Sequence, residues 1–468
     1  MAHSASFQLI SLGCKVNQAE GEDLAATLRG LGWADAPDEG SADLVIVNTC
    51  TVTGEAARQC RQRIRRALRS GARVIATGCA AHPAAEDASL RNLPGLLLVE
   101  PDKHRVAKFV EECGMRSAEG GADGEARPCE PRPAIRVAAR MRAPPPCLRR
   151  PASGHPRACD SALRAPHSAL DRSRALLKIQ DGCPASCAYC IVPKVRPEVR
   201  SAPPEAVLEQ VAGLIAAGFR EIVVCGIHLG LYGAALEPPV RLADLLGQMI
   251  GVAGLGRLRL SSIEPMEVSD PLLSLMASEP ERMCPHLHMP LQSGDDGVLA
   301  RMSRPYSSAA FLAVVERSRR AIPQMAITTD VLVGFPGETD DAFAETLRVC
   351  REAGFSRLHV FPFSKRPGTR AASMKPEVPR GVVHERRRRA AELGQSLAAE
   401  YRASLVGRTA QVVIEKVLPD GGAEGLSERY VRVRLRCPLP AGAARRSILP
   451  VATTGLEGDA LLGQVAPV

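Results

Sequence analysis

Three short hydrophobic runs in the first hundred residues each end at a turn, and segments with helical spacing separate them. The runs are Phe7–Leu12, Leu44–Val47 and Arg73–Thr77, and the helix-like segments are Glu20–Gly30 and Gly54–Ser70. In the second helix-like segment, apolar side chains recur every three or four positions, and arginines occupy the other sides. Buried strands that alternate with helices predict a parallel α/β sheet.

The same alternation resumes at Ala175 and continues for six strand–helix units. The strand candidates are Leu176–Gln180, Glu221–Cys225, Leu258–Ser262, His286–Met289, Ile327–Val333 and Leu358–Phe363. The helix candidates are Pro204–Ala217, Ala309–Ala321 and Asp340–Ala353. Six such units favour a barrel or partial barrel over an open sheet, and in such barrels the reactive centre lies at the C-terminal ends of the strands.

A charged helix near Val382–Tyr401 precedes a region with strand periodicity, which includes Gln411–Val417 and Tyr430–Arg436. In the latter, apolar and basic residues alternate, and the basic ones are Arg432, Arg434 and Arg436. This alternation predicts one core face and one basic face. We therefore expect a small C-terminal β-barrel.

Residues 114–173 differ from the rest, since Pro, Arg, Ala and Gly dominate and no strand or helix period persists. This predicts a linker or disordered insertion. The stretch from Arg127 to Arg174 contains eleven arginines and only three acidic residues. Such a segment is either a basic arm for nucleic acid or inert, and we favour the inert interpretation because it lacks aromatic residues. The predicted domains are thus 1–115, 116–173, 174–402 and 403–468.

Composition and cysteine usage narrow the function. The chain has 468 residues, 45% of them hydrophobic and 24% charged, as in ordinary soluble proteins. We find no secretory signal and no apolar run long enough to cross a membrane, so a cytoplasmic protein is expected. Fifteen cysteines in a reducing compartment indicate metal or redox chemistry rather than disulfides. The net charge of +9 suits an anionic partner.

The strongest motif is formed by Cys183, Cys187 and Cys190, spaced by four and three positions directly after a predicted strand. Three thiolates can hold one cubane iron–sulfur cluster and leave one iron open to a small molecule. A zinc site is the alternative, but zinc favours four ligands in paired short spacings.

A second trio, Cys14, Cys50 and Cys79, is spread along the chain, and each cysteine follows the end of a predicted strand. The C-terminal ends of parallel strands share one edge, so these thiols are expected to converge. Scattered cysteines are more often buried apolar residues, and we interpret the remaining nine cysteines in that way.

The first motif, with Tyr189 before its last cysteine, resembles the radical S-adenosylmethionine (SAM) superfamily. The segments around the second trio (Leu12–Gln18, Asn48–Thr53, Thr77–Ala80) resemble the N-terminal domain of methylthiotransferases. The resemblance implies two 4Fe–4S clusters, one of which binds SAM for reductive cleavage to a 5′-deoxyadenosyl radical. The other cluster binds or supplies the transferred sulfur, which a first SAM methylates.

The resemblance also implies an architecture and further SAM contacts. The fold would be a flavodoxin-like parallel α/β domain, a radical SAM partial (β/α)6 TIM barrel and a C-terminal TRAM barrel. Besides Tyr189, the implied SAM-binding residues are Gly226, Glu264, Gln292, Asp330 and Gly334. Taken alone, Glu264 would be an ordinary solvated acid, and the segment containing Gly334 an ordinary turn.

The segment Gly425–Val433 resembles TRAM modules, which bind RNA, so Arg432, Arg434 and Arg436 are expected to contact tRNA. The string Leu12–Gln18 resembles enzymes that modify N6-threonylcarbamoyladenosine at tRNA position 37. Isopentenyladenosine and a ribosomal-protein aspartate are the alternative substrates. A non-enzymatic iron–sulfur electron carrier or RNA-binding sensor is the alternative class. A flavodoxin-like or ferredoxin-like reductant is expected, and the sulfur donor is not identified.

Overall fold

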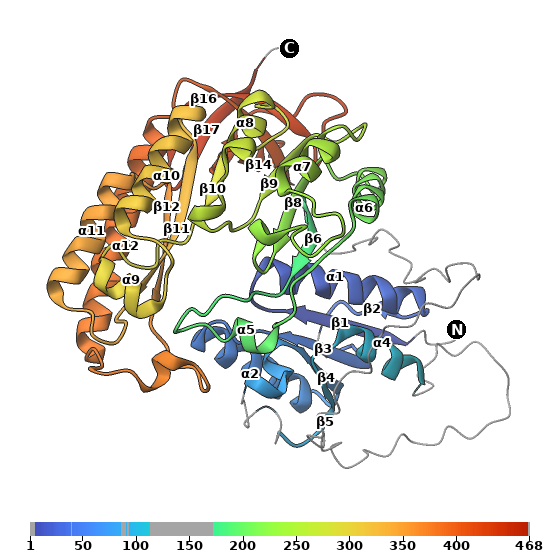
Figure 1. The fold of residues 1–468 in the computed structure, drawn as a ribbon. Helices are drawn as coiled ribbons and strands as arrows, with labels where there is room; N and C mark the ends of the chain where they lie inside the picture. The colour runs from blue at the N-terminus through green and yellow to red at the C-terminus, as the bar shows by residue number, and fades with distance from the viewer. Residues whose placement is uncertain (1–4, 39, 86–89, 91–92, 113–171, 467–468) are drawn as a thin grey trace, which may run out of the picture.

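The computed structural model describes residues 5–38, 40–85, 90, 93–112 and 172–466. The predicted insertion therefore lies almost entirely outside the described residues. Three bodies follow one another along the chain: an N-terminal α/β sheet, an open half-barrel and a closed C-terminal β-barrel (Figure 1). This arrangement confirms the predicted fold class.

The N-terminal sheet has five strands, all parallel, in the order β2-β1-β3-β4-β5, which is the flavodoxin-like order. The strands are β1 Ser6–Ser11, β2 Ala34–Asp35, β3 Leu44–Thr49, β4 Arg73–Gly78 and β5 Leu96–Glu100. The helices are α1 Lys15–Gly30, α2 Gly54–Arg69 and α4 Lys103–Glu112, with 3-10 turns η1 Cys79–Ala81 and η2 Pro83–Ala85. Helix α1 begins five residues before its predicted start, because the Cys14 thiol caps it by accepting the N–H of Asn17.

The half-barrel contains all six predicted strands. They are β6 Ala175–Asp181, β8 Glu221–Gly226, β9 Arg257–Leu260, β10 His286–His288, β11 Ala326–Val333 and β12 Arg357–Pro362. Neighbouring strands run parallel, and isolated bridges such as Ser262–His288 join β9 to β10. Among the described strands β6 and β12 are not paired with each other, so the barrel stays open on one side. A short strand that we did not predict, β7 Arg200–Ser201, pairs antiparallel with β6.

Helices cover the outer face of the half-barrel. They are α6 Pro204–Ala216, α7 Leu242–Ile250, α8 Asp270–Ser278, α9 Asp296–Met302, α10 Ser308–Ala321 and α11 Asp340–Ala353. The short helix α5 Val192–Val195 packs instead against the N-terminal domain. The 3-10 turns are η3 Leu229–Leu231, η4 Pro265–Glu267 and η5 Arg370–Ser373. The largest apolar core lies between these helices and the strands and includes Ile222, Val224 and Leu258, all fully buried. Polar side chains are thereby left to the inner face of the strands.

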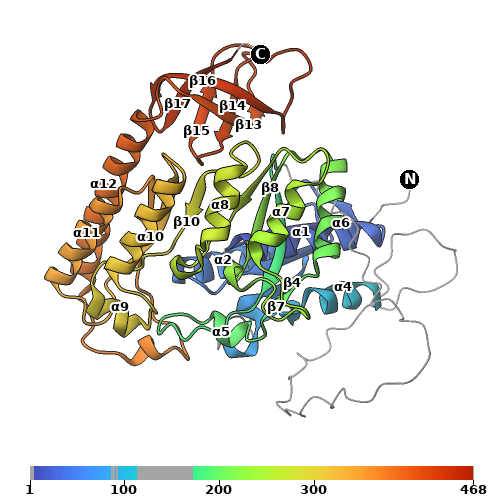
Figure 2. The same cartoon turned by 45° about the horizontal axis from the view of Figure 1, so that its top comes forward.

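Helix α12 (Arg380–Ala403) runs beside α11 to the C-terminal barrel (Figure 2). That barrel closes in the order β13-β14-β15-β17-β16. Its strands are β13 Thr409–Val417, β14 Ala423–Ser427, β15 Arg432–Leu435, β16 Ile448–Glu457 and β17 Ala460–Val465. Val433 and Leu435 are buried and the arginines beside them are not, as the alternation predicted. No helix in the described parts of the chain is long and apolar enough to span a membrane.

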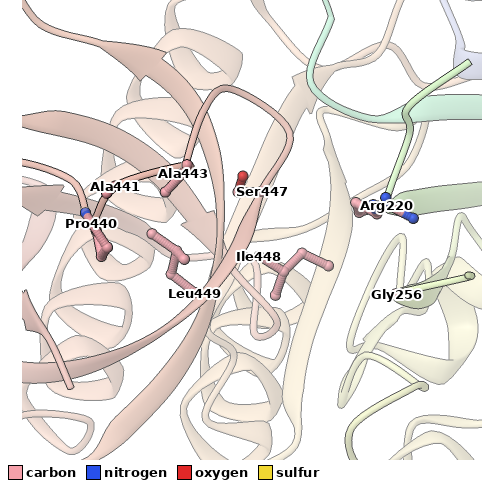
Figure 3. Close-up of a pocket in the computed structure, with 9 residues that line it drawn as sticks. Arg220, Gly256, Pro440, Ala441, Ala443, Ser447, Ile448 and Leu449 are labelled. Atoms are coloured by element: carbon pink, nitrogen blue, oxygen red, sulfur yellow. The ribbon is translucent and has the colours of Figure 1, made fainter. Parts of the chain in front are cut away.

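A buried carboxylate joins the half-barrel to the C-terminal barrel. Glu221 is fully buried and pairs with Arg257 and Arg259, each only 1% exposed. These guanidinium groups donate onward to four backbone carbonyls of the C-terminal barrel, those of Gln411, Leu426, Ser427 and Glu428. Burial opposes ionisation, but the two arginines lower the pKa of Glu221 to about 2. Beside this junction lies an open pocket of about 420 Å³, bordered by Arg220 and the 440–449 segment (Figure 3).

We predict that Glu221→Gln destabilises the protein by roughly 3–5 kcal/mol, because it leaves two buried guanidinium groups without their anion. The thermal midpoint and the rate of proteolysis near the barrel junction measure the loss. The matched control is Glu316→Gln, which breaks an exposed pair with Arg320 and should leave both near wild type. Equal behaviour of the two variants would contradict the assigned role of Glu221.

The same carboxylate gives a pH signature. Its folded pKa of about 2 lies below its ordinary value of 4.5, so its contribution is present above pH 4.5 and is lost as pH falls toward about 2. The stability gap between wild type and Glu221→Gln should therefore narrow over that interval.

Candidate iron–sulfur and SAM site

The N-terminal thiols converge at the carboxyl edge of the sheet. Cys14 follows β1, Cys50 follows β3 and Cys79 follows β4. β1 and β3 flank the point where the strand order reverses, which is where open α/β sheets bind ligands. A Cβ atom on Gly13, whose φ is +96°, would lie 2.4 Å from the Cys50 sulfur, so glycine permits this close approach. Burial and then the neighbouring thiols Cys79 and Cys14 raise the pKa of Cys50 to about 12.

Two asparagines hold the loops that carry Cys14 and Cys50. The buried Asn17 amide donates to the carbonyls of Leu12, Asn48 and Thr49 at 2.7, 3.2 and 3.2 Å. The Asn48 amide donates back to the Asn17 carbonyl at 2.6 Å. Because these groups are buried, the reciprocal hydrogen bonds fix the first two cysteines relative to each other. Both asparagines lie in the segments quoted above for the family resemblance, but that pattern did not reveal their role.

The half-barrel trio, Cys183, Cys187 and Cys190, lies on the loop after β6, at the C-terminal end of the half-barrel. Gly182 has φ +79°, and a Cβ there would lie 1.8 Å from the Glu198 carbonyl oxygen, so the loop requires glycine. The Cys183 N–H donates to the Arg196 carbonyl at 3.1 Å. Tyr189 packs into an apolar cluster with Ala188 and Phe335, which anchors the loop to the late part of the half-barrel.

Two side chains that the sequence did not single out lie directly against this trio. Arg304 Nη1 is 3.4 Å from the Cys187 sulfur, and the same guanidinium pairs with Glu264. His228 Nδ1 is 3.2 Å from the Cys183 sulfur, and its Nε2 is 2.6 Å from Glu267. Glu264, predicted to contact SAM, is thus linked to the Cys187 thiol through the Arg304 side chain.

The other predicted SAM contacts lie at three places in the half-barrel. Gly226 ends β8, where a Cβ would lie 2.8 Å from the Gln180 side chain, and Gln180 in turn donates to the carbonyls that begin the cluster loop. Gln292, in the left-handed region with φ 66°, donates its N–H to the Asp330 carbonyl at 2.8 Å. Gly334 backs onto α12, where a Cβ would lie 2.5 Å from Val383. The SAM-binding roles of these residues remain predictions.

One buried ion network links the two trios. Glu20 on α1 pairs with Arg196 at 2.6 Å and with Lys103 at 2.7 Å, and Lys178 also pairs with it. Burial raises the pKa of Glu20, but these cations outweigh burial and hold it well below its usual value. Arg196 also pairs with Asp181 at 2.8 Å, and its Nε lies 3.5 Å from the Cys79 sulfur.

Arg196 therefore touches the N-terminal trio with its side chain and the loop of the half-barrel trio with its backbone. Cys79 also packs with Ile191 and Val195, which lie one and five residues after Cys190. The two sets of thiols consequently lie on either side of one interface.

The thiols fit cubane clusters better than single ions. Within the described residues, no three His, Cys, Asp or Glu side chains are grouped as they would be around one metal ion. A cubane binds each thiolate to a different iron and so separates its ligands more widely. Cys60 lies near Cys50, but its thiol accepts the Cys50 N–H at 3.3 Å and belongs to the helix packing. Three thiols can bind three of the four irons of such a cubane.

Of the three arginines predicted to bind RNA, two lie on β15 and Arg436 directly follows it, and all three already have carboxylate neighbours. Arg434 pairs with Glu424 at 2.6 Å, Arg436 pairs with Glu457 at 2.5 Å, and Arg432 lies 3.4 Å from Asp459. Any RNA phosphate at this face would have to compete with these acids.

Comparison with known proteins agrees with this geometry. Residues 177–350 match the radical SAM superfamily, and residues 6–95 match the uncharacterized protein family UPF0004. The chain is 33% identical to threonylcarbamoyladenosine tRNA methylthiotransferase MtaB of Chlamydia pneumoniae, over 98% of each chain. It is 32% identical to tRNA-2-methylthio-N(6)-dimethylallyladenosine synthase of Streptomyces coelicolor, over 91% of this chain and 79% of that one.

A solved structure has the same fold. The radical SAM methyltransferase TsrM of Kitasatospora setae superposes with a TM-score of 0.50 at 17% identity, over 79% of this chain and 75% of that one. Two facing thiol trios, the matched superfamily and the full-length relatives lead to one conclusion. The chain belongs to the radical SAM methylthiotransferase family.

Proposed function

We propose that this protein replaces the hydrogen on C2 of N6-threonylcarbamoyladenosine, beside the tRNA anticodon, with a methylthio group. Relatives that align over most of the chain carry the name of this activity. The observation that carries the proposal is the Glu20–Arg196 network, which holds the two thiol trios across one interface. Methylthiolation needs both a hydrogen-abstracting centre and a sulfur-carrying centre at one substrate carbon, so the two must be held together.

Each trio would hold one 4Fe–4S cluster: Cys183, Cys187 and Cys190 in the half-barrel, and Cys14, Cys50 and Cys79 in the N-terminal sheet. When bound, the clusters and SAM supply the one-electron cleavage, the hydrogen abstraction and the sulfur that the reaction requires.

The protein's own groups orient and insulate this chemistry. Arg304 holds Glu264 beside Cys187, and Glu267 orients the His228 ring beside Cys183. Charge-assisted hydrogen bonds of this kind fix side chains before the substrate arrives. The Gln180 amide donates a hydrogen bond to the Gly182 carbonyl at the start of the loop that carries the half-barrel trio. Gly226 has no side chain and so leaves room for that amide. We propose SAM contacts for Tyr189, Gly226, Glu264, Gln292, Asp330 and Gly334.

The C-terminal barrel would bind the tRNA. Its basic face carries Arg432, Arg434 and Arg436, and phosphates would displace the acids that now neutralise them. We also propose the domain limits 1–115, 116–173, 174–402 and 403–468, a cytoplasmic location, and a flavodoxin-like or ferredoxin-like reductant. The tRNA substrate named for the relatives supports the cytoplasmic location, and the need for an external electron supports the reductant.

The cluster assignment predicts iron contents. Anaerobically reconstituted wild type should hold about eight irons per chain, four in each cluster. Replacing either trio by alanine should leave about four irons, because the other trio is intact. Colorimetric iron and sulfide assays measure this. The control Cys350→Ala, which removes a buried thiol from α11, should keep the wild-type content. Full iron content after loss of either trio would contradict the assignment.

The substrate assignment predicts a change in cellular tRNA. Nucleoside mass spectrometry of a strain lacking the gene should show loss of the methylthio group from threonylcarbamoyladenosine and accumulation of the unmethylthiolated nucleoside. Methylthio-isopentenyladenosine should be unchanged. Loss of the isopentenyl product instead would assign the chain to the other tRNA activity. If both nucleosides stayed unchanged, the ribosomal-protein aspartate would become the candidate substrate.

The Glu20–Arg196 network predicts that cleavage of SAM and methylthiolation of the substrate can be uncoupled. Arg196→Met keeps the carbonyl that holds Cys183 but removes the ion pairs to Glu20 and to Asp181. We expect near wild-type 5′-deoxyadenosine formation and about a hundredfold less methylthiolation, because the sulfur centre is misplaced. Arg200→Met, which removes an exposed pair with Glu198, is the control. A parallel fall in both products would indicate damage to the SAM site and not to the docking of the two domains.

A further inference from the structure

The inner face of the half-barrel carries a hydrogen-bonded row of polar side chains. Strand alternation turns His286, His288 and Thr328 away from the apolar core that contains Leu287 and Ile327. Thr328 Oγ1 lies 3.2 Å from His286 Nε2 and 2.9 Å from His288 Nδ1. The row continues to Asp330, 3.4 Å from His288, and to His359, whose ring packs edge-on against His288.

The C-terminal barrel contributes a ring to this inner face. Tyr430 precedes β15 and has φ 64°, a conformation that bulky residues rarely adopt. Its ring stacks on His286 with a centroid distance of 4.9 Å, and the guanidinium of Arg259 lies 5.0 Å from the ring centroid. The backbone strain is thus compensated by contacts that hold the tyrosine ring inside the half-barrel.

The N-terminal domain contributes a cation at the same place. Lys15, next to Cys14, begins α1, and its ammonium lies 6.0 Å from the Tyr430 ring centroid. Val16 and Ala19, at the start of α1, pack on Cys225, so the helix start lies against the inner face. Three domains therefore meet around Lys15.

Lys15 differs from the other cations of this region in its partners. Arg259 is committed to Glu221, Lys178 to Glu20 and Asp181, and Arg174 to Glu415 at 3.2 Å. For Lys15, the described residues include no carboxylate within ion-pair distance. His359 and His286 do not supply positive charge, because burial lowers the pKa of His359 to about 4 and that of His286 well below its usual value. The charge of Lys15 is therefore available to an anionic ligand.

We propose that Lys15 binds the carboxylate of the threonylcarbamoyl group, with the Tyr430 and His286 rings forming the wall beside it. This inference rests on the proposed function and names the group that selects its substrate. The threonyl carboxylate is ionised at neutral pH, whereas a dimethylallyl group carries no charge. N6 and C2 flank N1 on the same edge of adenine. A carboxylate held at Lys15, one residue from Cys14, therefore keeps C2 near the sulfur-carrying thiol trio.

The test compares anticodon stem–loops that differ only at the modified adenosine: threonylcarbamoyladenosine, its methyl ester and unmodified adenosine. Binding to the full-length reconstituted protein is followed by fluorescence anisotropy at one salt concentration. Wild type should bind the acid about tenfold to a hundredfold more tightly than the ester, as expected for a charged hydrogen bond. Lys15→Met should bind all three equally, at the wild-type affinity for the ester. Lys15→Arg should keep a preference for the acid.

The matched control is Lys108→Met, which removes an exposed ammonium from α4 and should keep the wild-type preference. Equal weakening of all three ligands by Lys15→Met would overturn the proposal and make Lys15 a phosphate contact. An undiminished preference for the acid in that variant would overturn it as well. The ester comparison on wild type needs no variant, so it decides even if Lys15→Met loses iron or fails to fold.

The outcome is separable from that of the proposed function. If wild type shows no preference for the acid while cells depend on the gene for the methylthio group, this inference fails and the function stands. If the preference is present and depends on Lys15, but tRNA from the deletion strain is unchanged, the carboxylate site stands and the function fails.

Discussion

The pairing of Glu20 with Arg196 is the interaction on which the rest of the structure depends. It is made between helix α1 of the N-terminal domain and the loop region of the half-barrel, and both side chains are largely buried. A buried ion pair is not necessarily more stabilising than apolar packing. Losing one partner is nevertheless costly, because the remaining charge stays buried without a counter-charge or solvating water. The pair therefore fixes the register of the interface more strongly than apolar contact alone would. It brings Cys79 to the loop of the half-barrel trio, and so sets two thiol sites side by side.

Helix α1 gathers several roles within two turns. Its cap is Cys14, Asn17 ties two cysteine loops together, and Glu20 makes the interdomain network. Lys15 reaches the inner face of the half-barrel, and Glu22 pairs with Arg172 at 2.8 Å. Glu221 has a similar role at the interface with the C-terminal barrel. It pairs with two guanidinium groups that donate hydrogen bonds to backbone carbonyls of that barrel. Each of the two interfaces is thus specified by a buried carboxylate of its own, Glu20 in one and Glu221 in the other.

Local patterns were sufficient to predict three strands of the N-terminal sheet and the six parallel strands of the half-barrel, because buried strands carry continuous apolar runs that are visible in one sequence. The strands β2, β5 and β7 were missed, since none of them carries such a fully buried run. The positions of Cys14, Cys50 and Cys79 at strand ends followed from the same runs. Glu20, Arg196 and Lys178 were not singled out, because a charged residue in a helix or loop looks the same whether solvent or another domain surrounds it. Arg304 and Tyr430 were missed for a related reason: their contacts join segments more than a hundred residues apart. The basic face of β15 was predicted, but the acids on neighbouring strands that neutralise it were not, since strand pairing decides them.

The central claim is that two open clusters lie close together in one protein. Electron paramagnetic resonance of the anaerobically reduced protein tests this directly, since each reduced cluster carries an unpaired electron spin. Faster spin relaxation of each cluster signal in wild type than in variants lacking the other trio is the predicted result. Identical relaxation in wild type and in both single-cluster variants, at full iron content, would contradict the account.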